Sequence, residues 1–372
     1  MKRVVLLGGG HAHIEVLRDL QANPDGQLHV LVVTPYPWLI YTGMLPGHIA
    51  GHYALEECTI DLAALARAAR ADLRLTTASL VSPDANEVVC ADGSVHPYDV
   101  LSLDVGSQPV LGAARGVQAH AIVVRPLERA VQGWNEVYAR AAKGRLKAIT
   151  VVGGGAGGIE LALAMNHRLR TTLEEPVPHV RLVSDAAGVG LAAGARRRLV
   201  RRMRRNGVAS HVGAAVAEVG RDFLRLDSGL EFTTDAVFWA TGAGAHPWIR
   251  DSGLATDERG FLLTNDRLQS VSHSNVFGAG DCATDPDHPR PRAGVFAVRA
   301  APILAANLRA AIHGQPLQPF RPPGNFLALI STGERHAVGT WGPLSWQGRW
   351  AWRWKDRIDR RFVAQYRAAK AS

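Results

Sequence analysis

The chain has 372 residues, of which 47% are hydrophobic and 20% are charged, and it contains 38 glycines. This composition excludes a disordered or fibrous chain and predicts a soluble α/β protein of about two domains. The formal charge of +9 is concentrated in residues 194–207 and 349–370. Because the rest of the chain is net acidic, the charge does not indicate nucleic-acid binding.

The first residues pass directly into a strand pattern, with no cleavable signal sequence. No apolar run approaches the roughly 20 residues that a membrane-spanning helix needs. The three cysteines, Cys58, Cys90 and Cys282, are scattered and fit neither a disulfide framework nor a zinc motif. We therefore expect a cytoplasmic protein.

Residues 3–20 follow the order strand, glycine turn, helix. The apolar run "RVVLLG" ends on Gly8, and apolar residues with helical spacing follow the turn. Gly8 permits a tight turn and Gly10 lets the backbone approach a pyrophosphate, which the amide donors of a helix N-terminus attract. His13 stands where the third glycine of this motif is expected. Two interpretations of His13 remain open: a donor to a phosphate, or a buried histidine with partners inside the protein.

A metal site is a weaker alternative for the histidines of this region. His48 and His52 have the i, i+4 spacing of a helical ligand pair, and His11 and His13 could join them. The latter pair belongs to a nucleotide turn, however, and no acid or cysteine completes the set. No metal is expected.

Residues 146–165 repeat the order strand, turn, helix with all three glycines present: Gly153, Gly155 and Gly158. The sequence therefore predicts two dinucleotide sites. In such units the second strand usually ends in an acid that binds a ribose hydroxyl. Here the corresponding strands end on Thr34 and on Ser184, so the choice between NADH and NADPH stays open.

Three further strands run into turns of small residues at 98–109, 236–248 and 260–283, and the last contains a Gly-Asp pair. With these segments the chain resembles the FAD-dependent pyridine nucleotide-disulfide oxidoreductase superfamily, in the branch without a redox disulfide that includes type II NADH dehydrogenases. More closely, it resembles the flavoprotein module found alone or fused ahead of selenophosphate synthetase (selenide, water dikinase). The segments that carry this closer resemblance are "GGGHAHIEVLRDL", "YTGMLPGHIAGHY", "YDVLSLDVGSQP", "AGVFAVRAAPILAANL" and "WRWKDRIDRRF".

The resemblance implies an α/β fold with two Rossmann-like dinucleotide-binding domains of the glutathione reductase type. It places the FAD-binding domain in residues 1–120 and 248–320, and an inserted NAD(P)H-binding domain in residues 121–247. A C-terminal hairpin and a basic, tryptophan-rich amphipathic helix follow in residues 321–372.

The resemblance also implies that FAD binds at the first turn and NAD(P)H at the second. Asp281 matches the acid that holds the ribityl chain or the pyrophosphate, and the helix near Gly294 points its positive end at the flavin. Glu160 matches the position that approaches the nicotinamide and is the implied catalytic residue. The implied cofactor-binding residues are Gly8, Gly10, His11, Ala12, His13, Thr34, Met44, Pro46, Gly106, Gly153, Gly155, Gly158, Ser184, Gly242, Gly280, Asp281, Gly294, Val295 and Phe296.

Catalysis in this class needs no side-chain nucleophile, because a hydride passes from the nicotinamide to the flavin. Disulfide reductases carry a cysteine pair in the segment that matches residues 39–53, which contains none here. Cys282 is expected to be a small buried residue. Electrons therefore leave for a small acceptor, foremost a quinone, although Gly294–Val295 replaces the Ala-Gln pair of type II NADH dehydrogenases. The alternative is a flavoprotein that acts on a selenium or sulfur compound, or with a partner of the selenophosphate synthetase type.

The arginine-rich stretch 196–205 predicts a helix with Leu199, Val200 and Met203 buried. Its arginines either form a solvated face or include one that accepts the 2′-phosphate of NADPH.

Residues 326–341 predict a hairpin, and a helix follows in which aromatic and apolar residues recur every four positions. Flanked by basic residues, this stripe has the composition of an interfacial helix on an anionic membrane. That interpretation would place the protein on the inner face of the cytoplasmic membrane. Asp356 and Asp359 argue against it, and the alternative is a cap that packs on the flavin domain. The stripe consists of Trp350, Trp354, Ile358, Phe362 and Tyr366.

Overall fold

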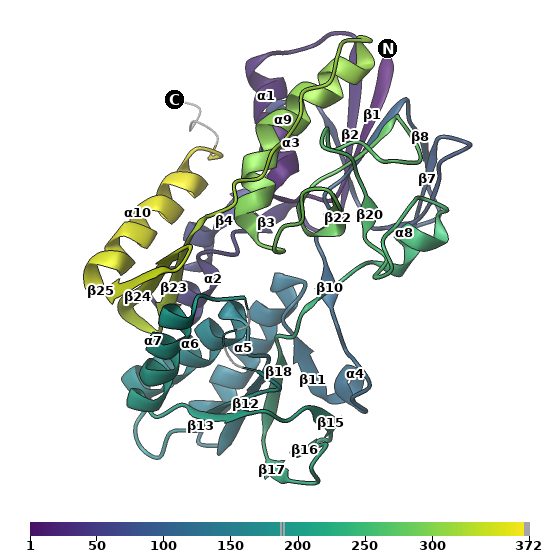
Figure 1. The fold of residues 1–372 in the computed structure, drawn as a ribbon. Coiled ribbons are helices and arrows are strands. Elements are labelled where there is room, and N and C mark those ends of the chain that lie inside the picture. The colour runs from purple at the N-terminus through teal and green to yellow at the C-terminus, as the bar shows by residue number, and fades with distance from the viewer. Residues whose placement is uncertain (187, 189, 368–372) are drawn as a thin grey trace.

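The computed structural model describes residues 1–186, 188 and 190–367. The end of the predicted basic segment, 368–370, lies outside the described residues. Two five-stranded parallel sheets, each covered by helices, form an upper and a lower unit in Figure 1. The C-terminal segment lies at the side of both units.

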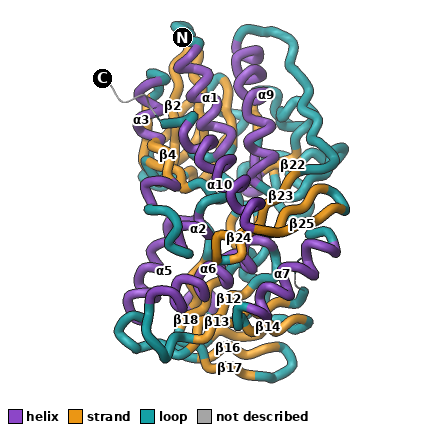
Figure 2. Tube along the Cα trace, turned by 90° about the vertical axis from the view of Figure 1, so that its left-hand side faces the viewer, coloured by secondary structure: helices purple, strands orange, loops and turns teal. Residues whose placement is uncertain are grey.

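The sheet of the first unit has the strand order β21-β9-β1-β2-β5, and all its neighbours are parallel. Its central strands are continuous apolar runs, as expected where helices cover both faces of a parallel sheet. Figure 2 shows the two long helices α1 and α9 side by side over this sheet. The bounds are β1 Lys2–Leu7, β2 Leu28–Thr34, β5 Asp72–Leu75, β9 Val100–Leu103, β21 Val276–Gly278, α1 His11–Ala22 and α9 Gly294–Ile312.

Smaller elements complete the first unit. An antiparallel β3–β4 pair with α2, α3 and η1 lies beside the sheet, and a three-stranded β6–β7–β8 sheet packs with α8. The short turn η2 follows β21. The bounds are β3 Trp38–Ile40, α2 Leu45–Ile49, η1 Leu55–Cys58, β4 Thr59–Asp61, α3 Leu62–Ala68, β6 Ala78–Ser82, β7 Glu87–Cys90, β8 Val95–Pro97, α8 Pro247–Asp251, β20 Leu262–Leu263, η2 Gly280–Cys282 and β22 Ala283–Thr284.

The sheet of the second unit has the order β11-β18-β12-β13-β14, again parallel throughout. The chain crosses between the units where β10 pairs with β19. The bounds are β10 Gln108–Pro109, α4 Val117–His120, β11 Ala121–Val123, α5 Leu127–Ala141, β12 Ala148–Val152, α6 Ala156–Thr172, β13 His179–Ser184, α7 Ala193–Arg205, β14 Ala209–Val212, β15 Val216–Val219, β16 Phe223–Leu226, β17 Glu231–Thr233, β18 Ala236–Trp239 and β19 Ala243–Gly244.

The arginine-rich helix α7 differs from its prediction at one position. Leu199 and Met203 are buried as predicted, but Val200 is 41% exposed. Arg202 is buried in its place, because its guanidinium pairs with the Glu334 carboxylate at 3.0 Å. The buried side of α7 therefore includes a paired arginine that the pattern did not predict, and it lacks Val200.

The predicted C-terminal hairpin gains a third strand. Gly342, with a φ of +54°, turns the chain so tightly that residues 344–348 pair directly with the preceding strand. Because a Gly-Pro pair stands at this turn, the sequence pattern did not predict the third strand. The bounds are β23 Leu327–Thr332, β24 Glu334–Trp341, β25 Leu344–Gly348 and α10 Arg349–Ala364.

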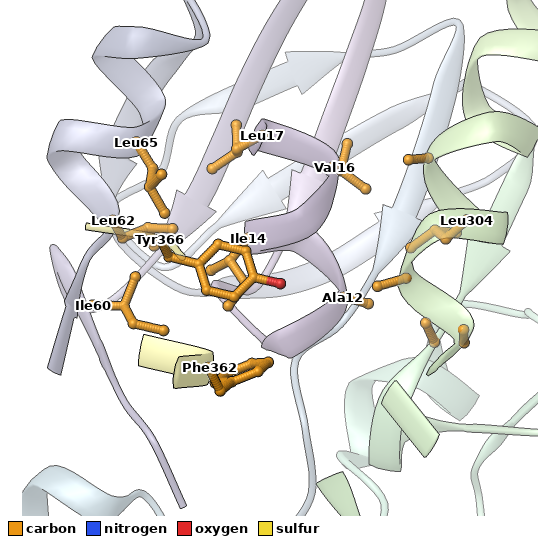
Figure 3. Close-up of a cluster of buried hydrophobic side chains, with 14 of the residues drawn as sticks. Ala12, Ile14, Val16, Leu17, Ile60, Leu62, Leu65, Leu304, Phe362 and Tyr366 are labelled. Carbon is orange, nitrogen blue, oxygen red and sulfur yellow. The ribbon is translucent and has the colours of Figure 1, made fainter. Parts of the chain in front are cut away.

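The predicted stripe changes its surroundings along α10. Trp350 and Trp354 are 54% and 41% exposed, whereas Phe362 and Tyr366 are 8% and 4% exposed. Figure 3 shows Phe362 and Tyr366 packed with Ile14 of α1 in one buried cluster. The C-terminal half of the stripe is thus a cap on the first unit, and the N-terminal half is open to solvent.

Helix α9 corrects the expectation that no apolar run approaches the length of a membrane-spanning helix. With 19 residues and a mean hydropathy of 1.5, it is long and apolar enough to cross a membrane by length and composition. Ala300, Ala301 and Leu304 are nevertheless buried against the first unit's core. Because its apolar side chains already face protein, α9 is a core helix in this fold.

We expect Phe362→Ala to lower the free energy of unfolding by about 3–5 kcal/mol, because a buried ring is lost. The ring stacks on Tyr41 with centroids 4.6 Å apart. Ile358→Ala, on the same helix but 39% exposed, is the matched control and should shift stability by about 0.5 kcal/mol or less. Urea denaturation measures both, and equal losses in the two variants would contradict the cap.

Candidate functional site

The first glycine turn lies against the end of strand β9. Gly8 has a φ of +94°, and a Cβ at this position would collide with the carbonyl oxygen of Asp104 and lie 2.8 Å from the Val105 Cα. Only glycine allows both the backbone conformation and this approach. Thr34, buried at the end of β2, lies beside the next residue of the turn, Gly9.

His13 takes the place of the third glycine by forming two internal hydrogen bonds. Its Nδ1 lies 2.6 Å from the Gly8 carbonyl oxygen, which can only accept, so Nδ1 carries the proton. Its Nε2 then accepts from the Ser102 hydroxyl at 2.8 Å. Burial lowers the pKa of His13 to about 4, so the ring is neutral. Because both ring nitrogens are engaged, the geometry favours a buried histidine over a phosphate donor.

Asp104 is a site residue that the sequence analysis missed. Its Oδ2 accepts from the backbone N–H of Ala12 at 2.7 Å and of His13 at 3.2 Å. The side chain is 3% exposed, and burial raises its pKa to about 7. The available signal was an acid at the end of a buried strand, "LSLD", two residues before Gly106.

Asp281 lies in η2, close to this turn. Its Oδ2 accepts from the Arg125 guanidinium at 2.8 Å and from the Ser107 hydroxyl at 3.3 Å. Gly280 faces the Asp104 carboxylate, since a Cβ there would collide with Oδ1 of Asp104. The fold thus gathers Asp104 and Asp281 at one end of the first sheet. Arg125, which precedes α5 of the second unit, also went unnoticed in the sequence.

Helix α9 begins next to the segment that includes α2. A Cβ on Gly294 would lie 3.5 Å from the Thr42 hydroxyl, and no side chain of the N-cap residue Ala293 caps the helix. Val295 and Phe296 follow in the first turn of α9, so their backbone lies at the N-terminus of this helix. Met44 and Pro46 are buried in the neighbouring α2 segment.

The first site has features that fit a dinucleotide. His11 Nε2, at the first residue of α1, is buried and has no hydrogen-bond partner within the described residues. A Cβ on Gly106 would meet no atom within 4 Å, so the space beside this turn is open. The α9 N-terminus adds free amide donors. A buried, unpartnered ring nitrogen and two helix ends around an open turn are suitable for FAD.

The second glycine turn is tight on one side and open on the other. Gly153, with a φ of +132°, lies against the carbonyl oxygen of Ala240, and Gly158 lies against that of Gly153. Cβ atoms at Gly155 and Gly242 would meet nothing within 4 Å. Space therefore remains at the N-terminus of α6, where a pyrophosphate would bind.

The end of β13 offers a hydroxyl and an acid rather than the usual glutamate. Ser184 Oγ donates to the Ala186 carbonyl oxygen at 2.7 Å. The exposed Asp185 accepts from the Ala186 N–H at 2.7 Å. Arg196 of α7 lies against Gly188 in the loop that follows. An acid and a base therefore lie at the loop that follows β13.

Glu160 connects α6 to the C-terminal sheet. Its Oε1 accepts from the Ser331 N–H at 2.7 Å, and desolvation raises its pKa to about 7, opposed by the charge of Lys355. Lys355 is buried and donates to Asp359 at 2.7 Å and to the Gly43 carbonyl oxygen at 2.7 Å. The Tyr41 hydroxyl donates to Asp359 at 3.3 Å. A buried polar network therefore lies beside the α2 segment.

The four histidines considered for a metal have separate roles. His48 Nδ1 lies 3.0 Å from the Tyr53 carbonyl oxygen, and His52 Nε2 lies 2.8 Å from that of Gly333. Among the described residues, no three His, Cys, Asp or Glu side chains are grouped to hold a metal ion.

The cysteines are free and buried in the structure. Burial raises the pKa of Cys58 and of Cys282 to about 12, and it also raises the pKa of Cys90. Cys282 is a small buried residue, as predicted. Because a thiolate is the reactive form, these side chains are poor redox groups.

Two Rossmann-like units with open glycine turns define a dinucleotide-dependent oxidoreductase without a redox disulfide. Residues 2–301 match the family described as pyridine nucleotide-disulphide oxidoreductase, and the chain belongs to this family.

The chain is also similar to individual known proteins in sequence and in fold. A probable NADH dehydrogenase of Dictyostelium discoideum is 25% identical, over 91% of this chain and 80% of its own length. Human ferroptosis suppressor protein 1 is 28% identical, over 68% of this chain and 64% of its own length. The structure of NDH2 from Plasmodium falciparum in complex with NADH superimposes with a TM-score of 0.85 at 13% identity, covering 98% of this chain and 97% of that chain.

The sulfide:quinone oxidoreductase of Aquifex aeolicus superimposes with a TM-score of 0.82 at 20% identity, covering 99% of this chain and 92% of that chain. These comparisons confirm the predicted fold class and the oxidoreductase class. They also confirm FAD and NAD(P)H as the cofactors at the level of the family.

We expect the triple variant Cys58→Ala, Cys90→Ala, Cys282→Ala to keep most of its rate of flavin reduction by NAD(P)H. The buried thiols with raised pKa values lack the thiolate that a redox role needs. Anaerobic stopped-flow absorbance measures the bleaching rate, with bound FAD as the control for folding. Loss of bleaching while FAD stays bound would show that a thiol takes part.

Proposed function

We propose that this chain is an FAD-dependent NAD(P)H oxidoreductase that reduces a quinone without a redox disulfide. The observation that carries the proposal is the pair of open glycine turns combined with three buried, unreactive thiols. We assign residues 1–120 and 248–320 to FAD, residues 121–247 to NAD(P)H, and residues 321–372 to the acceptor side. Bound FAD would accept a hydride from NAD(P)H and return both electrons to the acceptor.

The proposed FAD site runs from the first turn to the start of α9. The amides around Gly10 and His11 would bind the pyrophosphate, with the unpartnered His11 Nε2 as a further donor. Asp281 would accept from a ribityl hydroxyl, beside Arg125 and Ser107. The α9 N-terminus at Gly294 would stabilise negative charge at the flavin edge. The remaining predicted contacts are Gly8, Ala12, His13, Thr34, Met44, Pro46, Gly106, Gly280, Val295 and Phe296.

The proposed NAD(P)H site uses the N-terminus of α6, with Gly153, Gly155 and Gly158 in the turn and Gly242 opposite. Ser184 would lie at the adenosine ribose. Asp185 favours a ribose hydroxyl there and Arg196 favours a 2′-phosphate, so both nucleotides are to be compared directly. Glu160 would lie near the nicotinamide end of the site.

The Lys355–Asp359 pair would supply protons on the acceptor side. Reduction of a quinone by NAD(P)H consumes one proton, since NAD(P)H, quinone and H⁺ give NAD(P)⁺ and quinol. Lys355 Nζ touches the Gly43 carbonyl oxygen in the segment where disulfide reductases carry their cysteine pair. It is therefore close to the expected acceptor face, and Asp359, Tyr41 and Glu160 form the polar network behind it.

The names of the relatives support a quinone as acceptor. An external alternative NAD(P)H-ubiquinone oxidoreductase B1 of Solanum tuberosum is 22% identical over 76% of this chain. The chain spans 55% of that protein's length, so the acceptor remains part of the proposal.

The second candidate is oxidation or reduction of a selenium or sulfur compound, alone or with a partner of the selenophosphate synthetase type. Similarity of "GGGHAHIEVLRDL" and "WRWKDRIDRRF" to the fused flavoprotein module favours it. In anaerobic assays, reoxidation of the reduced protein by such compounds but not by quinones would select this candidate.

We expect the double variant Lys355→Met, Asp359→Leu to separate the two half-reactions. It removes both charges of the Lys355–Asp359 pair together, so neither of the two is left buried without the other. Bleaching by NAD(P)H should stay close to that of the unmodified protein, while reoxidation by a soluble quinone should slow about 100-fold or more, as proton transfer is lost.

Anaerobic double-mixing stopped-flow measures both half-reactions. Lys2→Met is the matched control, because Lys2 forms an exposed pair with Asp99. Unchanged reoxidation in the double variant would exclude the Lys355–Asp359 pair as proton source. Failure of NAD(P)H to bleach the unmodified protein would overturn the proposed function.

We further propose that the exposed half of α10 attaches the protein to an anionic membrane, at the inner face of the cytoplasmic membrane. Trp346, Trp350 and Trp354 form a tryptophan stack with ring centroids 6.3–6.4 Å apart. Exposed arginines flank this stack. The basic residues are Arg349, Arg353, Arg357 and Arg361, together with Arg360, which pairs with Glu57 at 2.8 Å.

The two acids that argued against a lipid surface face the protein. Asp356 accepts from the Tyr53 hydroxyl at 2.7 Å and from Arg360 Nε at 2.9 Å. Asp359 is buried with Lys355. The open face is therefore aromatic and basic, which suits an anionic headgroup layer. A quinone would be reached from the same layer.

We expect Trp350→Ser, Trp354→Ser to weaken binding to phosphatidylglycerol vesicles by about tenfold or more, because two indoles no longer enter the interface. Co-sedimentation measures binding, which should fall with added salt and be absent from phosphatidylcholine vesicles. Trp38→Ser, at a tryptophan that is 47% exposed in β3, is the matched control. Equal binding of all three proteins would exclude α10 as the attachment site.

A further inference from the structure

Asp104 lies at the place where the negatively charged pyrophosphate of FAD would bind in the proposed site. Its Oδ2 accepts from the Ala12 and His13 amides at 2.7 and 3.2 Å, in the first turn of α1. Its Oδ1 faces Gly280 in the neighbouring turn. A carboxyl that is 3% exposed thus occupies part of the helix end that a pyrophosphate would approach.

The groups that face Asp104 do not neutralise it. From α1, His11 and His13 are neutral near pH 7, because burial lowers the pKa of each to about 4. From η2, Cys282 is a neutral thiol with a pKa raised to about 12, and Asp281 is a second acid. The nearby cations act on Asp281: the Arg125 guanidinium pairs with its carboxylate at 2.8 Å, and Arg292 donates to its carbonyl oxygen at 3.0 Å. Ala297 of α9 is apolar.

Two buried charges of the same sign disfavour the ionised form of the weaker acid. FAD brings a doubly negative pyrophosphate to this helix end, and the first turn of α1 compensates only about half an elementary charge. Asp104 is already a weak acid in the protein alone, since burial raises its pKa to about 7. Protonation would remove the repulsion, leave Oδ2 on the two amides, and turn Oδ1, the oxygen beside Gly280, into an O–H donor.

We propose that Asp104 is a proton-linked positioning residue of the FAD site, which takes up a proton when FAD binds. The inference rests on the proposed position of FAD at the first glycine turn. Binding would convert Asp104 from a competing anion into a neutral hydrogen-bond donor. FAD would therefore be held less tightly as the pH rises above neutrality.

The sign follows from the two protonation states. FAD raises the pKa of Asp104, so the bound state holds more protons than the free state in the window above about pH 7. The Kd for FAD should rise in that window, approaching tenfold per pH unit for one linked proton. Asp104→Asn keeps an oxygen on the amides and cannot ionise, so its Kd should not change with pH.

Equilibrium dialysis of the holoprotein between about pH 6 and pH 9, with free FAD measured by fluorescence, tests this expectation. A second readout needs no variant: in weak buffer with an indicator dye, FAD binding to the unmodified apoprotein near pH 8 should take up about one proton. Equal pH slopes for the unmodified protein and Asp104→Asn would overturn the proposal. So would the absence of proton uptake.

Two further variants distinguish an error in the proton linkage from an error in the proposed FAD position. Asp61→Asn is the matched control, because Asp61 caps α3 by accepting from the Ala64 N–H at 2.8 Å and is exposed. It should keep the slope of the unmodified protein. Asp281→Ala should weaken FAD binding at every pH. If Asp281→Ala leaves the FAD affinity unchanged, the proposed FAD position is wrong. If Asp281→Ala weakens FAD binding but the Kd of the unmodified protein does not change with pH, only the proton linkage is wrong.

Discussion

The contact between Gly8 and the backbone of Asp104 is the constraint on which the first dinucleotide site depends. It brings the end of β9 so close to the turn that any side chain at Gly8 would collide with it. At this distance the Asp104 carboxylate reaches the α1 amides, and Ser102 reaches the His13 ring. The missing third glycine is thus accommodated, because every polar atom of the His13 ring has a partner in the buried turn.

The C-terminal segment contacts both units at their common edge. The Ser331 amide binds Glu160 of α6, and Glu334 pairs with Arg202 of α7. Lys355 binds the Gly43 carbonyl oxygen in the first unit. These contacts place a buried ion pair next to the segment that carries cysteines in disulfide reductases. In the proposed function, this ion pair would supply the proton that quinone reduction consumes.

Helix α10 serves two purposes because its stripe does not follow the helical repeat. Residues four positions apart are rotated by about 40°, since each residue advances about 100° around the axis. From Trp350 to Phe362 the stripe turns far enough around α10 to leave solvent and enter the core against α1. Asp356 and Asp359 lie on the side that faces Tyr53 and Tyr41, so the exposed side is free of both acids.

The sequence alone determined the two strand–turn–helix units, the superfamily and the absence of a cysteine pair, because each depends on local backbone requirements or on short motifs. Gly8 and Gly153 could be recognised since their left-handed φ angles exclude most other residues. Only the tertiary structure revealed Asp104 and Arg125, whose partners lie 92 and 156 residues away in the chain. It also decided that Arg202 is buried and Val200 exposed, because the distant Glu334 provides the pairing charge. Such long-range pairings arise where separate segments meet in the fold, and no periodicity within one segment encodes them.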